Sequence, residues 1–528
     1  MRFDKSMSDE KVNIVDVSPS AQSCADVEFY ARLKNLAENR LDYRLHSLDL
    51  SSPTPSTLSL ELENNPVFFH LVDIIYMHKL KGLLETLKKN NCIVIIGGGV
   101  EIAMYCRELL TEFKDIDAVI RAPEFDKVLE QLIGKGIDDI DLAQIKGIAF
   151  RRPGTGKEIV VNENPPLSLD IDNLNSTAFF LRGKTRREWY PVIVSLGCKY
   201  NCQYCGFQFL YSTDSKNPLI YRKKAAKTIA DEMELLSSWG QKKFSFFCHQ
   251  VLDDDTIFPQ YIASLGEEIL KRKLDISFRF SAKPSLIRKN VESLKLLKES
   301  GLALIDIGID SGISRFHEMY KTGSTVRDCI AALQSMSETG IEFDAFFIFY
   351  DPYLTLEELN ENLDFIAEIK PYYSHLSLPF SAHLDTRIFN STLTLRYGMP
   401  ILDKLRRDNL LVEKPGFVSQ PVAKFRDRQV VFVYSIYRAL NEIILKKIRP
   451  LFHDREAVRR YPILDTLLLK VMENIYLAVK ENRYNEIKDY AFEAEKQVKD
   501  TLRPFIVEIG RDFPRYSNKE FEKTILNE

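Results

Sequence analysis

In YPVIVSLGCKYNCQYCGF, residues 190–207, an apolar run leads directly into a group of cysteines. An apolar run of this length, rich in β-branched residues, predicts a buried strand. Cys198, Cys202 and Cys205 follow it with the spacing CxxxCxxC. Three thiols on one short loop can bind one metal centre, but they leave a tetrahedral ion or a cubane cluster one ligand short. The rest of the chain must therefore indicate what supplies the missing ligand.

Beyond the cysteines, strand patterns alternate with helical patterns as far as about residue 398. We expect further strands in KFSFFCHQ (243–250), DISFRFSAK (275–283), LALIDIGID (302–310), EFDAFFIFYDP (342–352) and HLSLPFSAH (375–383). With the strand before the cysteines these make six, and the helices between them favour a full or partial (β/α)6 barrel. Active sites of such barrels lie at the C-terminal ends of the strands, which is where the three thiols are expected.

The first part of the chain also alternates strands and helices. KVNIVDVSPS (11–20) and CIVIIGGG (92–99) predict parallel strands, whereas DVEFYARLKNLAENR (26–40) and HLVDIIYMHKLKGLLETLKKN (70–90) predict helices. This alternation is typical of a doubly wound, Rossmann-like domain, although residues 37–62 are irregular for one.

These patterns divide the chain into four parts. We predict a Rossmann-like domain over residues 1–150, a hairpin and a Pro- and Asn-rich linker over 151–189, the barrel over 190–398, and a helical region over 399–528.

The composition is that of an ordinary globular protein, with 45% hydrophobic and 28% charged residues. A net charge of -3 gives no general attraction to nucleic acid. No apolar stretch reaches the length of a membrane span, and the first residues lack the apolar core of a signal peptide. We therefore expect a cytoplasmic protein that binds neither membrane nor nucleic acid. The eight cysteines cluster only once, which predicts reduced thiols with one metal or redox site.

The CxxxCxxC spacing, with Tyr204 just before the last cysteine and a βα series after it, resembles the radical S-adenosylmethionine (SAM) superfamily. In that family three cysteines bind three irons of a 4Fe-4S cluster, and SAM binds the fourth through its amino and carboxylate groups. The resemblance implies that Cys198, Cys202 and Cys205 hold such a cluster and that SAM supplies the missing ligand. A zinc site is the alternative, but zinc needs a fourth ligand, and the next cysteine, Cys248, follows a whole βα unit.

The resemblance also implies which strand-end residues contact SAM. By position, Asp310 and Ser311 correspond to a Glu-Ser pair that often faces the SAM ribose, with Asp in place of Glu here. The candidates for the SAM amino group and carboxylate are, respectively, Gln250 with Asp253 and Arg279 with Ser281. The simpler interpretations are a helix cap for the Asp-Ser pair and a solvated helix start for the acidic run.

The N-terminal βα array is similar to the first domain of cobalamin-binding radical SAM enzymes. IVIIGGGVEIAM (93–104) corresponds to their glycine-rich strand end, and glycine there lets a ligand approach the backbone closely. The DxHxxG motif that places a histidine beneath cobalt in other cobalamin proteins is absent, and Ala122 and Pro123 replace a usual glycine. We hypothesise that the domain binds cobalamin; the alternative is a domain that has the fold without the cofactor.

The resemblance implies an enzyme that reductively cleaves SAM to a 5'-deoxyadenosyl radical. With cobalamin, the expected reaction is C-methylation of a natural product or peptide; without methyl transfer, it is a cyclisation, oxidation or rearrangement. A non-catalytic iron-sulfur or zinc scaffold is the alternative from another class. The expected partners are a small-molecule or peptide substrate and an electron donor such as flavodoxin or ferredoxin. His383, Asp385 and Arg387 follow the last predicted strand and are candidates to face the substrate.

Overall fold

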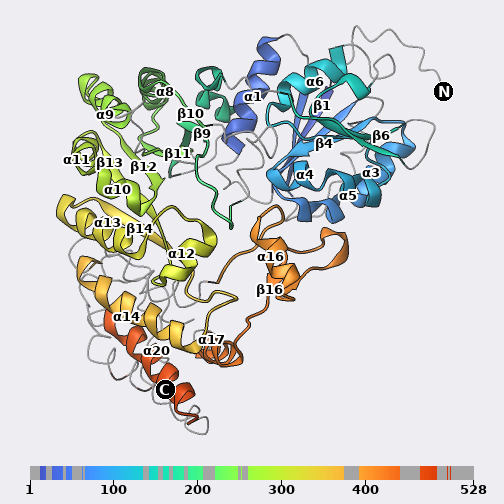
Figure 1. Cartoon of the computed structure of the whole chain (residues 1–528). Coiled ribbons are helices and arrows are strands. Elements are labelled where there is room, and N and C mark those ends of the chain that lie inside the picture. The colour runs from blue at the N-terminus through green and yellow to red at the C-terminus, as the bar shows by residue number, and fades with distance from the viewer. Residues whose placement is uncertain are drawn as a thin grey trace.

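The computed structural model has an N-terminal sheet, a curved parallel sheet and a C-terminal group of helices (Figure 1). It describes residues 12–18, 26–39, 43–49, 62, 66–134, 142–152, 158–165, 170–182, 188–205, 221–247, 251–252, 260–373, 392–440, 464–483, 496 and 500. The predicted α/β fold class, with a Rossmann-like sheet before a partial barrel, is confirmed.

The N-terminal sheet has seven strands among the described residues, in the order β2-β1-β3-β4-β5-β6-β7. The strands are β1 (Val12–Ser18), β2 (Tyr43–Asp49), β3 (Val67–Leu71), β4 (Val94–Gly98), β5 (Ala118–Ile120), β6 (Ile148–Arg151) and β7 (Ile159–Val161). The first five run parallel, and β6 and β7 are antiparallel additions. The chain passes to opposite sides of β1 in forming β2 and β3, so β1 and β3 flank a topological switch point, where ligands of such sheets bind.

Helices cover both faces of this sheet because its strands alternate their side chains between two cores (Figure 1). Phe68 and Ile95 belong to the core that also contains side chains of α1 (Asp26–Glu38) and α6 (Phe125–Gly134). Their neighbours Phe69 and Ile96 belong to the core under the opposite helices. Those helices are α3 (Met77–Lys89), α4 (Val100–Met104) and α5 (Cys106–Glu112).

The strand β3 corrects the helix predicted over residues 70–90. VFFHL is fully buried as a strand, and the α-helix begins only at Met77, after the short 3-10 helix η2 (Ile74–Tyr76). A short apolar run that is buried on both faces has no period that distinguishes strand from helix. The strand β2, within the segment described as irregular, was also not predicted.

The predicted hairpin is present as the antiparallel pair β6 and β7, with Phe150 opposite Val160. It extends the N-terminal sheet through its contact with β5, so the sheet continues beyond residue 150. The short 3-10 helix η4 (Leu142–Gln144) precedes the hairpin, and η5 (Ile171–Asn173) and η6 (Ser176–Arg182) lie between the hairpin and the barrel.

The second sheet is a partial barrel with five parallel strands in the described part of the chain, in the order β14-β13-β12-β11-β8. They are β8 (Tyr190–Ile193), β11 (Lys243–Phe247), β12 (Ser277–Ala282), β13 (Leu302–Asp310) and β14 (Glu342–Phe347). The sixth predicted strand, residues 375–383, lies outside the described residues. The helices of the partial barrel are α8 (Ala226–Ser238), α9 (Tyr261–Lys271), α10 (Pro284–Lys289), α11 (Val291–Glu299), α12 (Ser314–Tyr320), α13 (Val326–Thr339) and α14 (Leu356–Tyr373).

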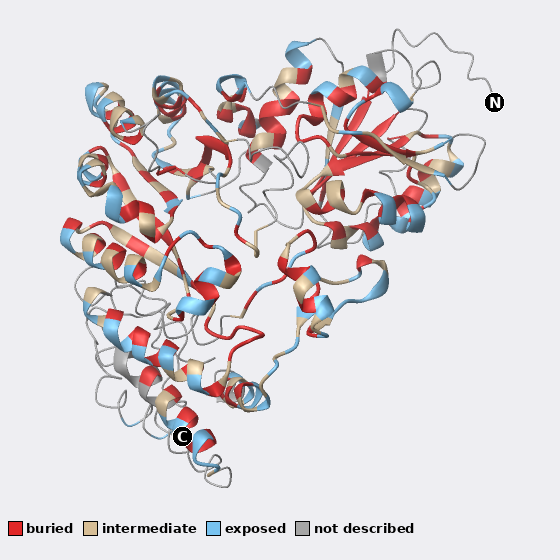
Figure 2. Cartoon of the chain, in the orientation of Figure 1, coloured by how far each residue is buried: buried red, intermediate tan, exposed pale blue. Residues whose placement is uncertain are grey.

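Buried and less buried residues both occur along the barrel strands (Figure 2). On β12, Phe278 and Phe280 are buried in the hydrophobic core, whereas Ser281, on the opposite face, is exposed. On β14, Phe346 is 57% exposed, whereas Phe343 and Phe347 are buried. The inner face of this partial barrel is therefore accessible, unlike the filled interior of a closed eight-stranded barrel.

Residues 392–426, here called the bridge segment, contact both the N-terminal domain and the partial barrel. The segment contains α16 (Ile401–Arg407) and a two-stranded pair, β15 (Leu411–Val412) with β16 (Val422–Ala423), around the 3-10 helix η8 (Pro415–Phe417). Gln420 Nε2 donates to Asp73 Oδ2 at 2.7 Å, and Arg426 N donates to Pro352 O at 2.8 Å. The region after it is helical where described, with α17 (Arg428–Leu440) packed against α20 (Leu464–Lys480).

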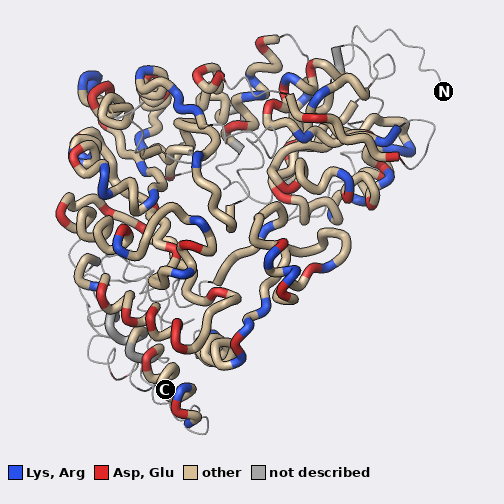
Figure 3. The backbone as a smooth tube through the Cα atoms, viewed as in Figure 1, with Lys and Arg blue, Asp and Glu red and all other residues tan. Residues whose placement is uncertain are grey.

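Charged residues of both signs are interspersed along the outer helices (Figure 3), in keeping with the small net charge. Within the described ranges, no helix is long and apolar enough to cross a membrane. The cytoplasmic location stays a prediction.

The glycine at the end of β4 generates a stability prediction. Gly98 has a φ of 130°, and an added Cβ would lie 2.2 Å from the backbone oxygen of Leu71. We expect Gly98→Ala to lower the free energy of unfolding by roughly 1–3 kcal/mol through backbone strain. Gly82→Ala in α3 is the control, because a Cβ there meets no atom within 4 Å and alanine favours a helix by about 1 kcal/mol. Thermal unfolding of both variants measures this; equal midpoints would contradict it.

Candidate active site

The three predicted ligand cysteines lie on one loop, residues 198–205, here called the cluster loop. It follows β9 (Ser195–Gly197), which pairs antiparallel with β10 (Tyr221–Lys223) beyond the C-terminal end of β8. Gln203 N donates to Tyr320 O at 2.9 Å, and Ile401 N donates to Gln203 O at 2.9 Å. The loop is therefore fixed by backbone bonds between the end of α12 and the bridge segment.

The cysteines differ in accessibility. Cys202 is buried, and Cys198 and Cys205 are half-buried; each of the described cysteines is a free thiol. Burial raises the pKa of Cys198, and the nearby Cys202 raises it further. No group of three His, Cys, Asp or Glu side chains among the described residues is arranged to hold a single metal ion. The donor set of three thiols on one loop fits a cluster in which each sulfur binds a different iron.

The predicted residues Tyr204 and Asp310 are brought together. Tyr204 Oη donates a 2.7 Å hydrogen bond to Asp310 Oδ2, which joins the cluster loop to the end of β13. Asp310 has a φ of 63°, so its carboxylate turns out of the strand direction. Burial raises the pKa of Asp310 above its ordinary value, against the opposing effects of Tyr204 and Lys283. Burial and the Asp310 charge raise the pKa of Tyr204 well above its ordinary value.

Ser311 is adjacent to Asp310 but is engaged differently. Its Oγ accepts from Ile313 N at 3.2 Å and donates to Asn362 Oδ1 at 3.3 Å. Its carbonyl oxygen lies 2.8 Å from His317 Nε2. The helix α12 (Ser314–Tyr320) has Ile313 as its N-cap and no side-chain cap, so these bonds do not make Ser311 a helix cap. Contact between Ser311 and SAM stays a prediction.

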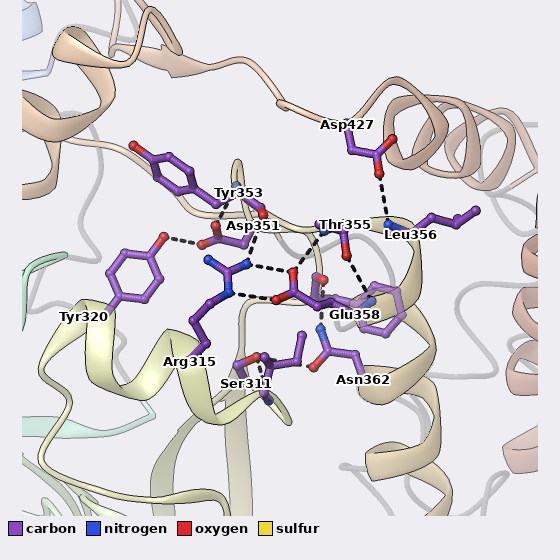
Figure 4. A network of polar contacts seen from close by, with 12 residues as sticks. Ser311, Arg315, Tyr320, Asp351, Tyr353, Thr355, Leu356, Glu358, Asn362 and Asp427 are labelled. Carbon is purple, nitrogen blue, oxygen red and sulfur yellow. Dashed lines mark hydrogen bonds and ion pairs between the residues drawn. The ribbon is translucent and has the colours of Figure 1, made fainter.

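Ser311 belongs to a polar network around the start of α14 (Figure 4). Arg315 is paired with Glu358 at 2.7 Å, and Asp351 accepts hydrogen bonds from Tyr320 Oη and from Tyr353 N. Tyr320 also accepts the backbone bond from the cluster loop. The network therefore supports the residue on which the cysteine loop rests.

Arg279 and Ser281 lie on the inner face of β12. The Arg279 guanidinium bonds Asp306 at 2.8 and 3.0 Å and lies 5.8 Å from the ring of Trp189, which directly precedes β8. Trp189 marks the N-terminal end of the barrel sheet, away from the cluster loop. The predicted contacts of Arg279 and Ser281 with the SAM carboxylate stay predictions, and the Arg279 side chain is already paired.

A cation that was not predicted lies closer to the cysteines. Lys283, directly after β12, has its Nζ 3.3 Å from Cys202 Sγ and 4.5 Å from the centre of the Tyr200 ring. Its signal in the sequence is its place one residue beyond a barrel strand, at the same end as the cysteines.

Other candidates lie outside the described residues. These are Gln250, Asp253, His383, Asp385 and Arg387. Their roles stay predictions.

A cavity of about 380 Å³ lies between the two sheets and is lined by residues near the C-terminal ends of strands from both. From the N-terminal sheet it is lined by His70, Gly98 and Gly99, and from the barrel by Cys205 and Phe247, among others. The glycine-rich strand end that resembles a cobalamin site and the last cysteine of the cluster loop therefore share one cavity.

The charged groups that line this cavity differ in burial, in pairing and in pKa. Glu101 is buried and accepts from Ile74 N at 3.0 Å; burial and the neighbouring Asp73 raise its pKa to about 8. Arg32 is paired with Asp126 at 3.1 Å. Arg396 is exposed and lowers the pKa of Glu101 electrostatically. At neutral pH the wall thus offers a protonated carboxyl and a guanidinium.

The fold and the site define a class: a partial-barrel protein with a thiol loop for a metal cluster at its mouth, preceded by a Rossmann-like domain. Residues 192–366 match the family model described as the Radical SAM superfamily. The chain therefore contains a radical SAM domain, which implies a 4Fe-4S cluster and SAM. The resemblance inferred from the cysteine spacing is confirmed.

Solved structures resemble the chain beyond this domain. One described as the cobalamin-dependent S-adenosylmethionine radical enzyme OxsB, with aqua-cobalamin and SAM bound, covers 99% of this chain and 84% of its own, with a TM-score of 0.71 at 14% identity. TsrM from Kitasatospora setae, a radical SAM methyltransferase with cobalamin and a [4Fe-4S] cluster bound, covers 68% and 70%, with a TM-score of 0.54 at 14% identity. At these identities the likeness establishes the fold.

Curated relatives match more narrowly. An anaerobic magnesium-protoporphyrin IX monomethyl ester cyclase from Rubrivivax gelatinosus is 25% identical over 327 residues, 58% of this chain and 55% of the relative. A 4'-phospho-dehydrooxetanocin synthase from Priestia megaterium is 26% identical over 368 residues, 65% and 45%. The chain spans about half the length of these relatives.

The polar network generates a pH prediction. Burial raises the pKa of Asp351 to about 6, so the folded chain keeps the proton on Asp351 up to a higher pH than the unfolded chain does. The stability that this proton contributes is complete below about pH 4 and is lost as the pH rises towards about 6. We expect the thermal midpoint of the wild type to fall more steeply over this range than that of Asp351→Asn. Parallel pH profiles in a thermal-shift series would contradict this.

Proposed function

We propose that the chain is a radical SAM enzyme that binds cobalamin in the cavity between its two sheets and acts on a small molecule or peptide. The observation that carries the proposal is the shared lining of that cavity by Gly98 and Gly99 on one side and by Cys205 on the other. A ligand in it would touch both the Rossmann-like domain and the cluster loop.

The residues present fit cobalamin in three respects. The cavity is lined from α1 and from the C-terminal ends of β3 and β4, beside the switch point between β1 and β3, and Rossmann-like sheets bind their ligands at this edge. Gly98 and Gly99 present backbone to the cavity. A Cβ on either glycine would meet the backbone oxygen of Leu71 or Val72. Phe29 and Phe125 add apolar surface to the wall. The likeness to OxsB and TsrM, both described with cobalamin, supports this assignment.

When bound, the cluster, SAM and cobalamin supply the radical and methyl chemistry, and the chain's own residues bind and orient them. Cys198, Cys202 and Cys205 would hold the cluster. The Tyr204–Asp310 hydrogen bond fixes the cluster loop against β13. Glu101 lines the cavity, and its pKa of about 8 favours its protonated form near neutral pH.

For the reaction, we propose C-methylation of an unactivated carbon. The substrate would be a natural product or a peptide, and flavodoxin or ferredoxin would donate the electron. The second candidate is ring formation, oxidation or rearrangement without methyl transfer. The cyclase and synthase activities in the relatives' names favour this second candidate. A non-catalytic scaffold has no evident use for a ligand-sized cavity beside a cluster cysteine.

Anaerobic reconstitution with iron, sulfide and hydroxocobalamin tests the binding proposal. We expect about four irons and one cobalt per chain after desalting, and 5'-deoxyadenosine when SAM and a reductant are added. Methylated product from a candidate substrate would support methyl transfer, and 5'-deoxyadenosine with an unmethylated product would support the second candidate.

Two variants separate the sites. Cys202→Ala should lose iron and keep cobalt. Val100→Trp should lose cobalt and keep iron, because Val100 lines the cavity and indole would fill it. Val422→Trp is the matched control, since Val422 is 61% exposed on β16. Iron without cobalt in the wild type, or cobalt retained equally in Val100→Trp, would contradict cobalamin binding in this cavity.

A further inference from the structure

Lys283 occupies a special position beside the cysteines. Its Nζ lies 3.3 Å from Cys202 Sγ, a hydrogen-bonding distance for sulfur. It also donates to the carbonyl oxygen of Thr322, which itself lies 3.9 Å from the same sulfur. The Lys283 ammonium therefore contacts both the Cys202 sulfur and the Thr322 carbonyl oxygen, which also lie close to each other.

Lys283 contacts the ring of Tyr200, and two further contacts hold the residues around that ring. Its Nζ lies 4.5 Å from the centre of the Tyr200 ring, which attracts a cation. Tyr200 packs so tightly on Gly323 that an added Cβ would lie 2.6 Å from ring atoms. Gly323 O in turn accepts from Ser285 Oγ at 2.9 Å, two residues after Lys283. The ammonium is thus placed by both of its neighbouring elements rather than by chance rotation of an exposed side chain.

Two other cations of the barrel, Arg279 and Arg315, form ion pairs away from the cysteines. Arg279 pairs with Asp306 on the inner face of the barrel sheet, and Arg315 pairs with Glu358 on the far side of α12. Lys283 is a cation within hydrogen-bonding distance of a cluster-loop sulfur.

A positive charge at this place has a defined electrostatic effect. One-electron reduction of a 4Fe-4S cluster adds one negative charge, takes up no proton in this step, and draws its electron from the external donor. A nearby ammonium stabilises the added charge, and hydrogen bonds to cluster sulfurs are among the factors that set cluster potentials. The contact therefore favours the reduced cluster.

We propose that Lys283 is a positioning and tuning residue that raises the reduction potential of the 4Fe-4S cluster through its hydrogen bond to Cys202. The inference rests on the cluster implied by the radical SAM domain and is independent of cobalamin binding.

The test is a redox titration of the reconstituted full-length chain without SAM, monitored by the electron paramagnetic resonance signal of the reduced cluster. Lys283→Met should keep its iron and show a more negative midpoint potential than the wild type. Lys283→Arg, which keeps the charge and the donors, should lie between them. Lys271→Met, at the exposed end of α9, is the control and should match the wild type.

Each outcome is decisive. Equal potentials for the wild type and Lys283→Met, at equal iron content, overturn the proposal. An unchanged potential with weaker SAM binding would place Lys283 on the SAM carboxylate and also overturn it. If Lys283→Met loses iron, Lys283→Gln, which keeps an N–H donor without the charge, replaces it in the titration. Loss of iron in both neutral variants, with normal iron in Lys283→Arg, would support the charged contact with Cys202.

Discussion

The placement of the cluster loop depends on two backbone hydrogen bonds at Gln203. Its N–H donates to Tyr320 O, and its carbonyl accepts from Ile401 N, each at 2.9 Å. Because both bonds use backbone atoms, the cysteines are positioned by the path of the chain and not by their own side chains. α12 and the bridge segment meet at this residue. A change in either element would therefore move the thiols relative to the glycine-rich end of β4.

The bridge segment extends this constraint to the N-terminal domain. Tyr397 packs against Tyr105 with ring centres 5.3 Å apart, and Gln420 reaches Asp73. The same segment contributes Arg396 to the cavity wall. A Rossmann-like switch point and a barrel mouth are each common ligand sites. Here the bridge segment contacts both domains beside a single cavity that the two ligand sites share. This arrangement is the structural basis for proposing that two cofactors act together.

Much of this was predictable from local sequence. CxxxCxxC after an apolar run indicated the cluster loop, and the residues that form the Tyr204–Asp310 hydrogen bond were both among the predicted contacts. The sequence did not indicate β3, because VFFHL is short, is buried on both faces and has no distinguishing period. Nor did it indicate the pairing of Gln420 with Asp73, 347 residues apart, since such contacts depend on tertiary packing. Lys283 was missed because a lysine beside a proline reads as an ordinary helix start.

In the proposed arrangement, the cavity brings cobalamin into contact range of the cluster. Electron paramagnetic resonance of the reduced full chain, loaded with both cofactors, can detect this, because cobalt(II) and the reduced cluster each carry an unpaired electron. We expect signals broadened or split by spin coupling in the doubly loaded chain, and one simple signal from each sample that contains a single cofactor. A spectrum of the doubly loaded chain that equals the sum of the two separate spectra would contradict it.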